Sequence, residues 1–495
     1  MDMKKQTIIC LLAILLAANV FSQKSLLPPP SLAFSQKLGE APHIFATTTS
    51  DASLSEVLDA TFDSITALTP IKGFNAAMML PDGTFWKRSK GVARELPATE
   101  LLTTDHLMAM GSISKTFVAT TLLLLVEEGY LALDDSIGQY IGPYPNVAGC
   151  ITIRQLLSHR SGLNDYLNEN PASGEALGND PAHIWTFDEI LNGYVLAPNF
   201  SPGASWSYSN TNYVLAGVLI EALTGQAWYQ VVRQKVIEPL ELAHTFIYPF
   251  ETPGGQPFAH VFADLQGNGT VIDVQGIGFP DSGIFSLAAS AGCFITTPAD
   301  LTIFMERIFG GHLLQASTLS EMQTDYIQNG SGLMYGLGAA SFPAPQNLEN
   351  WGHDGDLLYK SVALFFPTEN MALAVQQNDD RSHAPENPNS VDYDNNDVFL
   401  ALLIAYMNYM PVTGVDEISA DNSMLLYPNP ANEQVVVACK AGKSATSATL
   451  FNLQGQLMMS QKIENQNIVR IDLSSLPSGI YEVRIGEQSE LLLKR

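Results

Sequence analysis

Basic side chains are scarce in this chain of 495 residues, which has 24 Lys and Arg against 50 Asp and Glu and a formal net charge of −26. No run rich in Lys or Arg occurs along it. Proteins that bind nucleic acid neutralise phosphates with clustered basic side chains, so we expect no nucleic-acid partner. The excess of acid favours solubility and identifies no substrate.

Cysteine is also rare, with four residues in the chain, and C-x-x-C and H-E-x-x-H elements are both absent. The sequence therefore predicts no metal site and no cofactor. Residues 392–397 have the carboxylates of a calcium loop but lack its glycine and its distant glutamate, so we expect a solvated polar turn there. For Cys150 and Cys293, a disulfide and two free thiols both remain open.

Long apolar runs are missing except near the N-terminus, where residues 8–20 follow Lys4 and Lys5. This pattern predicts a secretory signal peptide over residues 1–22, because the run is shorter than the ~20 residues that span a bilayer. Residues 23–50 are rich in Ser, Pro and Thr and are expected to form a linker. We therefore expect a secreted protein, extracellular or on the cell surface.

The chain as a whole has the composition of a globular protein, with 46% hydrophobic and 15% charged residues. The body begins near Asp51. Apolar residues spaced three and four apart predict a helix from Leu54 to Leu68, and residues 73–90 alternate like a hairpin around Pro81-Asp82-Gly83. A helix followed by antiparallel strands is thus expected to open the body.

One short segment has the features of a nucleophile. Ser112 and Lys115 stand three residues apart, in front of the apolar run Val118 to Val126. Side chains three apart on a helix share a face, so the Lys115 amine can reach the Ser112 hydroxyl. Such a lysine can take the hydroxyl proton if burial lowers its pKa, and helix N-terminal amides can stabilise an oxyanion. The alternative is a capping serine followed by a surface lysine.

Two further elements follow in the chain. Tyr208 and Asn210 form a Y-x-N triplet after a Pro-Gly turn and before an apolar helix predicted at Val214 to Leu223. His353-Asp354-Gly355 is the one H-x-G in the chain and precedes a predicted strand, Ser361 to Pro367. A glycine in such a strand lets another backbone approach closely.

Together, S-x-x-K, Y-x-N and H-x-G in this order resemble the motifs of the penicillin-recognising serine hydrolases, in particular class C β-lactamases and serine-type D-Ala-D-Ala carboxypeptidases of the S12 type. The resemblance covers residues 51–409. It implies an α+β fold in which an antiparallel sheet is flanked by helices and joined by a mainly helical region. The active site is expected where the two parts meet.

The resemblance also implies a reaction. Ser112 attacks a carbonyl group, while Lys115 and Tyr208 pass its proton to the leaving group, with the identity of the base left open between them. The backbone amides of Ser112 and Asp356 stabilise the oxyanion. Water then releases the acyl group.

Substrate binding is implied for Asn210, which would bond a substrate amide, and for His353 and Gly355. His353 and Asp354 stand where many relatives have Lys-Thr, which removes a fixed cation and a hydroxyl from the carboxylate site. We therefore expect a small-molecule or peptide substrate, with esters, amides or D-amino-acid peptides favoured over β-lactams. A peptidase or esterase, a true β-lactamase, and a slowly deacylating penicillin-binding protein or sensor all remain open.

The C-terminal part is predicted to be separate. After a linker over residues 410–424, short alternating segments indicate a small β-sandwich over residues 425–495, and periodicity alone also fits a binding module. The Y-P-N-P start at Tyr427 and the element from Asp472 to Gly479 resemble a type IX secretion sorting domain. That resemblance implies the outer-membrane secretion machinery as a partner and no part in catalysis.

Overall fold

The computed structural model describes residues 53–264, 271–327, 332–345, 348–380 and 394–409 and, near the C-terminus, 425–427, 434–438, 447–452, 456–462, 468–477, 479–485 and 488–494. The predicted signal peptide and both predicted linkers, residues 1–22, 23–50 and 410–424, therefore lie outside the described residues. The chain divides into two compact units, Met1–Tyr409 and Met410–Arg495. Each unit is described by itself below.

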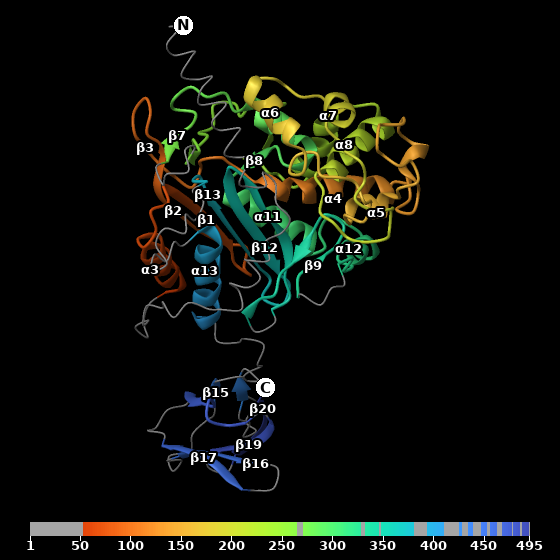
Figure 1. Ribbon diagram of the computed structural model, residues 1–495. Helices are drawn as coiled ribbons and strands as arrows, with labels where there is room; N and C mark the ends of the chain where they lie inside the picture. Colours follow the sequence, from red (N-terminus) through yellow and green to blue (C-terminus); the bar gives the residue numbers. More distant parts are fainter. Residues whose placement is uncertain are drawn as a thin grey trace. The chain divides into compact units, whose positions relative to one another are not determined.

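An antiparallel sheet of eight strands, in the order β3-β2-β1-β13-β12-β11-β10-β9, forms the centre of the first unit (Figure 1). The predicted hairpin at residues 73–90 is present, and its first strand also pairs with β13. The strands are β1 (Gly73–Met79), β2 (Phe85–Arg94), β3 (Glu100–Leu101), β9 (Met334–Tyr335), β10 (Ala340–Ser341), β11 (Trp351–Leu357), β12 (Tyr359–Phe366) and β13 (Met371–Gln377).

Helices cover both faces of this sheet. Helix α3 (Leu54–Thr66) packs against α13 (Asn395–Tyr409) and β2, and α13 also contacts β12 and β13. Helix α11 (Pro298–Phe309) contacts β1, β12 and β13, and it lies behind the sheet where α13 lies in front (Figure 1). Every residue of β1 and β13 is buried, as expected for strands covered on both sides.

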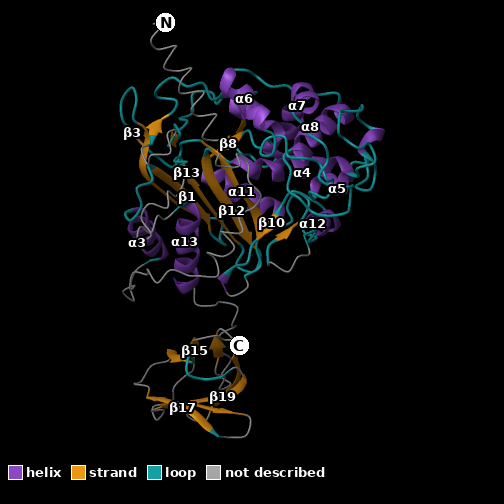
Figure 2. Ribbon diagram, in the orientation of Figure 1, coloured by secondary structure: helices purple, strands orange, loops and turns teal. Residues whose placement is uncertain are grey.

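A mainly helical region, purple in Figure 2, adjoins the sheet. Its two apolar helices, predicted from the runs after Ser112 and Asn210, pack against each other at its centre. They are α4 (Ser114–Glu127) and α8 (Thr211–Thr224), and the others are α5 (Ile153–Leu157), α6 (Pro171–Asn179), α7 (Phe187–Gly193), α9 (Trp228–Val232), α10 (Ser282–Ala288) and α12 (Ala316–Met322).

Short elements complete this unit. Strand β8 pairs with β4 and β5, and β6 pairs with β7. Their bounds are β4 (Met108–Ala109), β5 (Phe246–Ile247), β6 (Phe262–Ala263), β7 (Ile272–Asp273) and β8 (Phe294–Thr296). Single helical turns are η1 (Gly111–Ile113), η2 (Ile137–Gln139), η3 (Arg233–Ile237) and η4 (Ala289–Ala291).

The polar segment that the sequence placed in a solvated turn begins a helix instead. The Asp394 carboxylate accepts hydrogen bonds from the backbone amides of Asn396 and Asp397, and Asp397 accepts one from the amide of Asp394. Both side chains are buried at the start of α13. The prediction of a solvated turn was therefore wrong for residues 394–397, because the carboxylates cap free helical amides.

The two body cysteines are not paired: Cys150 is exposed, Cys293 is buried, and both thiols are free. Within the described ranges, no group of three or more His, Cys, Asp or Glu side chains could hold a metal ion. None of the helices in those ranges is long and apolar enough to cross a membrane.

The second unit contains two antiparallel sheets, in the orders β14-β15-β18 and β17-β16-β19-β20. Val435 and Val437 from the first sheet share a buried cluster with Leu450, Val483 and Leu492 from the second. This agrees with the predicted β-sandwich. The strands are β14 (Leu425–Tyr427), β15 (Gln434–Ala438), β16 (Ser447–Asn452), β17 (Leu457–Lys462), β18 (Ile468–Asp472), β19 (Gly479–Ile485) and β20 (Gln488–Lys494).

Candidate active site

Ser112 lies in the η1 turn between the sheet and the helical region. Strand β4 leads into this turn, and the backbone of Met110 is fixed by its amide, which donates to the Phe294 carbonyl, and by its carbonyl, which accepts from the Ser361 hydroxyl. Gly111 then turns the chain with φ of 52°, a left-handed conformation that favours glycine. Helix α4 follows at once, so Lys115 stands one turn after Ser112.

Two side chains contact the Ser112 hydroxyl oxygen. The Lys115 amine lies 3.0 Å from it and also donates to the Ala291 carbonyl at 2.8 Å. The Tyr208 hydroxyl lies 2.8 Å from the same oxygen. Ser112, Lys115 and Tyr208 therefore meet at one point, although Tyr208 is 96 residues distant in the chain.

The strand β11 closes the site from the sheet side. A Cβ atom at Gly355 would lie 1.9 Å from the Met110 carbonyl oxygen and 2.9 Å from the Ser112 amide nitrogen. A Cβ atom at Gly111 would lie 2.6 Å from the Asp356 amide nitrogen. Only glycine fits at either place, and this contact sets the Asp356 amide beside Gly111 and the Ser112 amide beside Gly355.

Asn210 is held by a carboxylate that the sequence did not reveal. Its amide nitrogen donates to both oxygens of Asp165, at 3.2 and 2.9 Å, and Asp165 also accepts from the side chain of Asn168. Asn210 and Asp165 are buried. Burial raises the pKa of Asp165, while the hydrogen bonds from Asn168 and Asn210 lower it.

Burial also sets the protonation of the groups at Ser112. It holds the pKa of Lys115 well below its usual range, although the negative charges of Asp165 and Asp354 oppose this effect. It raises the pKa of Tyr208 well above the usual range. A neutral amine and a protonated phenol are the pair favoured by these directions, which provides one proton acceptor and one proton donor at the same hydroxyl.

His159 fixes the segment that carries Tyr208. Its carbonyl accepts from the Ser207 amide at 3.0 Å, and its Nδ1 accepts from the Ser209 amide at 3.1 Å. The residues on both sides of Tyr208 are thus bonded to one histidine, whose own φ of 59° lies in the left-handed region. The sequence alone gave His159 no role.

His353 lies below the protein surface and has no exposed side-chain area for a direct substrate contact. Its side chain is fully buried, with Nε2 3.2 Å from the Tyr335 hydroxyl and Nδ1 donating to the Asp354 carbonyl. Burial lowers the pKa of His353 to about 3, so the ring is neutral at pH 7. Both ring nitrogens have protein partners, and direct substrate binding by His353 stays a prediction.

The Tyr335 hydroxyl links the two histidines, because His159 Nε2 lies 3.1 Å from it on the other side. Since Nδ1 of a neutral His159 accepts from Ser209, its Nε2 carries the hydrogen and donates to Tyr335. The Tyr335 hydroxyl can then donate to His353. A chain of three side chains thus joins the Tyr208 segment to β11, and Tyr335 had no signal in the sequence.

The fold belongs to the β-lactamase-like class. Its features are an eight-stranded antiparallel sheet with flanking helices and a serine that lies between a lysine and a tyrosine where the sheet meets the helical region. The chain matches the model of the Beta-lactamase family over residues 58–393 and belongs to that family. The tail matches the model of the Secretion system C-terminal sorting domain over residues 425–495. The expected family, the α+β fold class and the sorting domain are therefore confirmed.

Solved structures with this fold include two enzymes similar to most of the body. A D-stereospecific amidohydrolase from Streptomyces sp. is 31% identical with a TM-score of 0.57, over 65% of this chain and 94% of that one. The D-amino acid amidase from Ochrobactrum anthropi SV3, complexed with L-phenylalanine amide, is 25% identical with a TM-score of 0.60, over 72% of this chain and 99% of that one.

Curated relatives match over shorter stretches. Penicillin-binding protein 4* from Bacillus subtilis is 32% identical over 35% of this chain and 38% of its own length. Esterase EstB from Burkholderia gladioli is 34% identical over 38% of this chain and 50% of its own length. The chain thus spans half or less of these two relatives. The relatives in this fold family are serine hydrolases of several kinds.

Proposed function

We propose that this chain is a secreted serine hydrolase that forms an acyl-enzyme on Ser112 and acts on amides or esters of D-amino acids. The observation that carries the proposal is the meeting of the Lys115 amine and the Tyr208 hydroxyl at the Ser112 oxygen, at 3.0 and 2.8 Å. Two side chains that can move a proton at a hydroxyl are what a serine nucleophile requires.

The lowered pKa of Lys115 makes this residue the general base in our proposal. Its neutral amine takes the Ser112 proton as the hydroxyl oxygen attacks the carbonyl carbon. Tyr208 stays protonated because its pKa is raised, and it donates to the leaving nitrogen or oxygen. The proton taken by Lys115 then returns to the Tyr208 oxygen, and the reverse transfers activate water for deacylation.

The negative charge of the forming oxyanion has two donors within reach in this proposal. The backbones of η1 and β11 touch at Gly111 and Gly355, which keeps the amides of Ser112 and Asp356 near each other. Two such amides aimed at the developing charge are the usual oxyanion hole of acyl transfer. Asn210, held by Asp165, would orient the substrate amide.

Electrostatics favour substrates without a carboxylate next to the scissile bond. His353 is neutral at pH 7, and the charge of Asp354 acts on both Lys115 and Tyr208. An anionic substrate such as a penicillin would be repelled there, whereas an ammonium group would be attracted. Similarity to two enzymes whose names specify D-amino acid or D-stereospecific amide hydrolysis supports the same choice.

The test is a comparison of kcat/KM for D-alanine p-nitroanilide, its L-enantiomer and a penicillin, with the Ser112→Ala variant as control. We expect turnover of the D-substrate, at least ~10-fold slower turnover of the L-substrate, and loss of both in the variant. Faster turnover of the penicillin would identify a β-lactamase. Acylation by the penicillin without turnover of any substrate would support a slowly deacylating penicillin-binding protein, a second candidate favoured by the similarity to penicillin-binding protein 4*.

The domain limits are part of the proposal. Residues 1–22 would be removed as a signal peptide, residues 51–409 would form the hydrolase, and residues 425–495 would engage the outer-membrane secretion machinery after passage through the periplasm. The mass of the secreted protein tests these limits. A mature chain that starts near Gln23 and ends before Tyr427 is expected, and a retained tail would favour a role in binding.

A further inference from the structure

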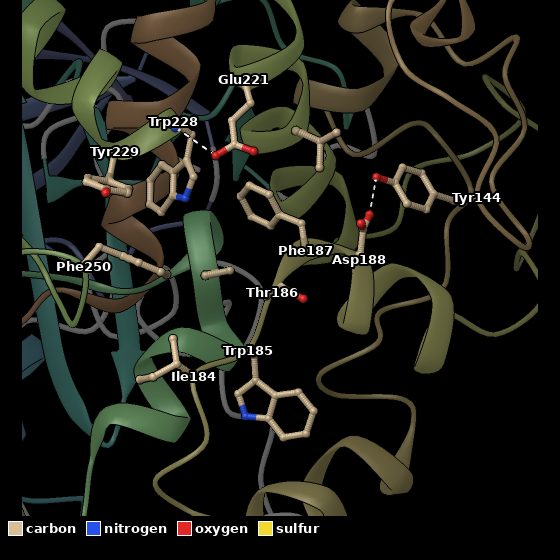
Figure 3. Close-up of a pocket in the computed structure, with 12 residues that line it drawn as sticks. Tyr144, Ile184, Trp185, Thr186, Phe187, Asp188, Glu221, Trp228, Tyr229 and Phe250 are labelled. Atoms are coloured by element: carbon tan, nitrogen blue, oxygen red, sulfur yellow. Dashed lines mark hydrogen bonds between the residues drawn. The ribbon is translucent and has the colours of Figure 1, made fainter. Parts of the chain in front are cut away.

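The helical region contains a cavity of about 320 Å³ that shares no residue with the candidate active site (Figure 3). It lies between α7, α8 and α9, and its size falls within the ordinary range of small-molecule sites. The lining residues used below are Phe187, Asp188, Glu221, Trp228, Tyr229 and Phe250.

One part of the wall is aromatic. The Trp228 ring contacts Phe187 and Phe250, with centroids 6.1 and 5.8 Å apart, and Tyr229 stacks on Phe250 at 5.4 Å. Trp228 is buried, but Phe187, Tyr229 and Phe250 are only half-buried. The lining therefore keeps aromatic surface accessible, and Figure 3 shows Trp228 to the left and Phe187 to the right below Glu221.

The other part of the wall is acidic. Glu221 accepts from the Trp228 amide at 3.1 Å, and Asp188 accepts from the Tyr144 hydroxyl at 2.9 Å. Among the described residues, neither carboxylate forms an ion pair with Lys, Arg or His. The two carboxylates are close enough to affect nearby pKa values. Burial and the charge of Asp188 raise the pKa of Glu221. Burial and the charges of both carboxylates raise the pKa of Tyr144 to about 12. The cavity is thus lined by two acidic side chains that no Lys, Arg or His pairs with in the part of the chain that the structure describes.

We propose that this cavity binds a small organic ammonium ion. Aromatic faces attract cations through their quadrupole, and two carboxylates at the same space add direct charge attraction. The apolar carbons of such a ligand would pack on Phe187 and Trp228, while its charged nitrogen would face Glu221 and Asp188. An anion would be repelled here, and an uncharged apolar molecule would offer the two carboxylates no charge attraction.

The cavity also touches the turn behind the active site. Ala289, which lines the cavity, has φ of 48°, a strained value for alanine. It begins η4, whose Ala291 carbonyl accepts from the Lys115 amine. A substitution in the cavity could therefore change activity through this turn without changing ligand binding. The affinity for the ligand has to be measured directly.

The test uses isothermal titration calorimetry of the full chain with choline and with 3,3-dimethylbutan-1-ol, which has the same shape without the charge. We expect saturable binding of one choline and at least ~10-fold weaker binding of the alcohol. Glu221→Gln and Asp188→Asn should each weaken choline about tenfold, and Phe187→Leu about threefold. Glu238→Gln, an exposed acid outside the cavity, is the matched control and should leave the affinity unchanged.

Asp188 is exposed, so its variant remains informative even if the Glu221 variant does not fold. Equal affinity for choline and the alcohol would overturn the proposal, as would the absence of saturable choline binding. Unchanged choline affinity in folded Asp188→Asn and Glu221→Gln would overturn it as well, because it would place the bound cation elsewhere.

Discussion

The imidazole ring of His159 lies against the phenol ring of Tyr208, with centroids 4.2 Å apart and planes inclined by 32°. The same histidine bonds the backbone on both sides of Tyr208, at Ser207 and Ser209. Tyr208 therefore reaches Ser112 from a segment that is bonded on both sides to one buried histidine, once through its carbonyl and once through its ring. His159 is a positioning residue for the proposed acid.

Replacing His159 by alanine is expected to lower both stability and kcat. The Ser209 amide would lose its buried acceptor and Tyr208 its ring contact, a combined cost of about 2–4 kcal/mol. His159→Asn should restore part of both, because asparagine tolerates the left-handed backbone that this position requires. Urea unfolding and steady-state kinetics measure the two effects. A loss of stability with kcat unchanged in the folded variant would reduce His159 to a structural residue.

Lys115 should control the pH dependence of acylation. Because burial lowers its pKa, kcat/KM is expected to rise with pH through a midpoint well below 10.5, as the amine loses its proton. Lys115→Arg keeps a positive charge that cannot be removed and should lower kcat by about 10²–10⁴-fold. Tyr208→Phe should lower kcat by a similar factor while retaining the rising limb. A rising limb that persists in Lys115→Arg and disappears in Tyr208→Phe would assign the base to Tyr208.

The buried histidines should make the fold sensitive to acid. The pKa of His353 falls to about 3 in the folded chain, whereas histidine in an unfolded chain has a pKa of about 6.5. The unfolded state therefore binds more protons below pH 6.5, and stability is fully present above that pH and lost as pH falls towards 3.

Each such histidine contributes a slope of up to about 1.4 kcal/mol per pH unit in this window. His159, whose pKa is also lowered by burial, acts in the same direction. Urea unfolding between pH 7 and pH 4 measures this slope of the unfolding free energy against pH. His353→Gln removes one titrating group and should lower the slope by up to about 1.4 kcal/mol per pH unit. An unchanged slope in that variant would show that His353 is protonated in the folded state.

The sequence predicted more of the site than of its surroundings. Ser112 and Lys115 are close because three-residue spacing on a helix fixes their relation, and this could be deduced from the sequence. The approach of Tyr208 and Gly355 depends on packing between distant segments, and only the resemblance to a known family indicated it. Asp165, in a loop, and Tyr335, in the short strand β9, were missed because their roles arise from contacts between distant segments that no local pattern encodes.

Misreadings have a physical cause as well. The polar run at 394–397 suggested a solvated turn because carboxylates are usually exposed, but Asp394 and Asp397 are buried at the start of α13, where each accepts from the other's backbone amide. The free thiols of Cys150 and Cys293 settle a choice that spacing left open, because pairing depends on the distance in space between two cysteines.

The sorting tail should be dispensable for chemistry. The hydrolase body and the tail each have their own buried core. A chain that ends at residue 424 is therefore expected to keep kcat/KM within about twofold and to stay inside the producing cell, in contrast to the full chain. Activity assays on both forms and fractionation of the culture measure this. Secretion of the shortened chain at the normal level would show that export does not require the tail.

The acyl-enzyme is tested most directly by time-resolved intact mass of the full chain after mixing with the p-nitrophenyl ester of N-acetyl-D-alanine, followed by peptide mapping. We expect a transient mass increase of one acyl group on the peptide that contains Ser112, decay as product forms, and no adduct in Ser112→Ala, whose turnover should fall by about 10³-fold or more. An adduct on another residue, or equal turnover in Ser112→Ala, would contradict the assignment of Ser112 as the nucleophile.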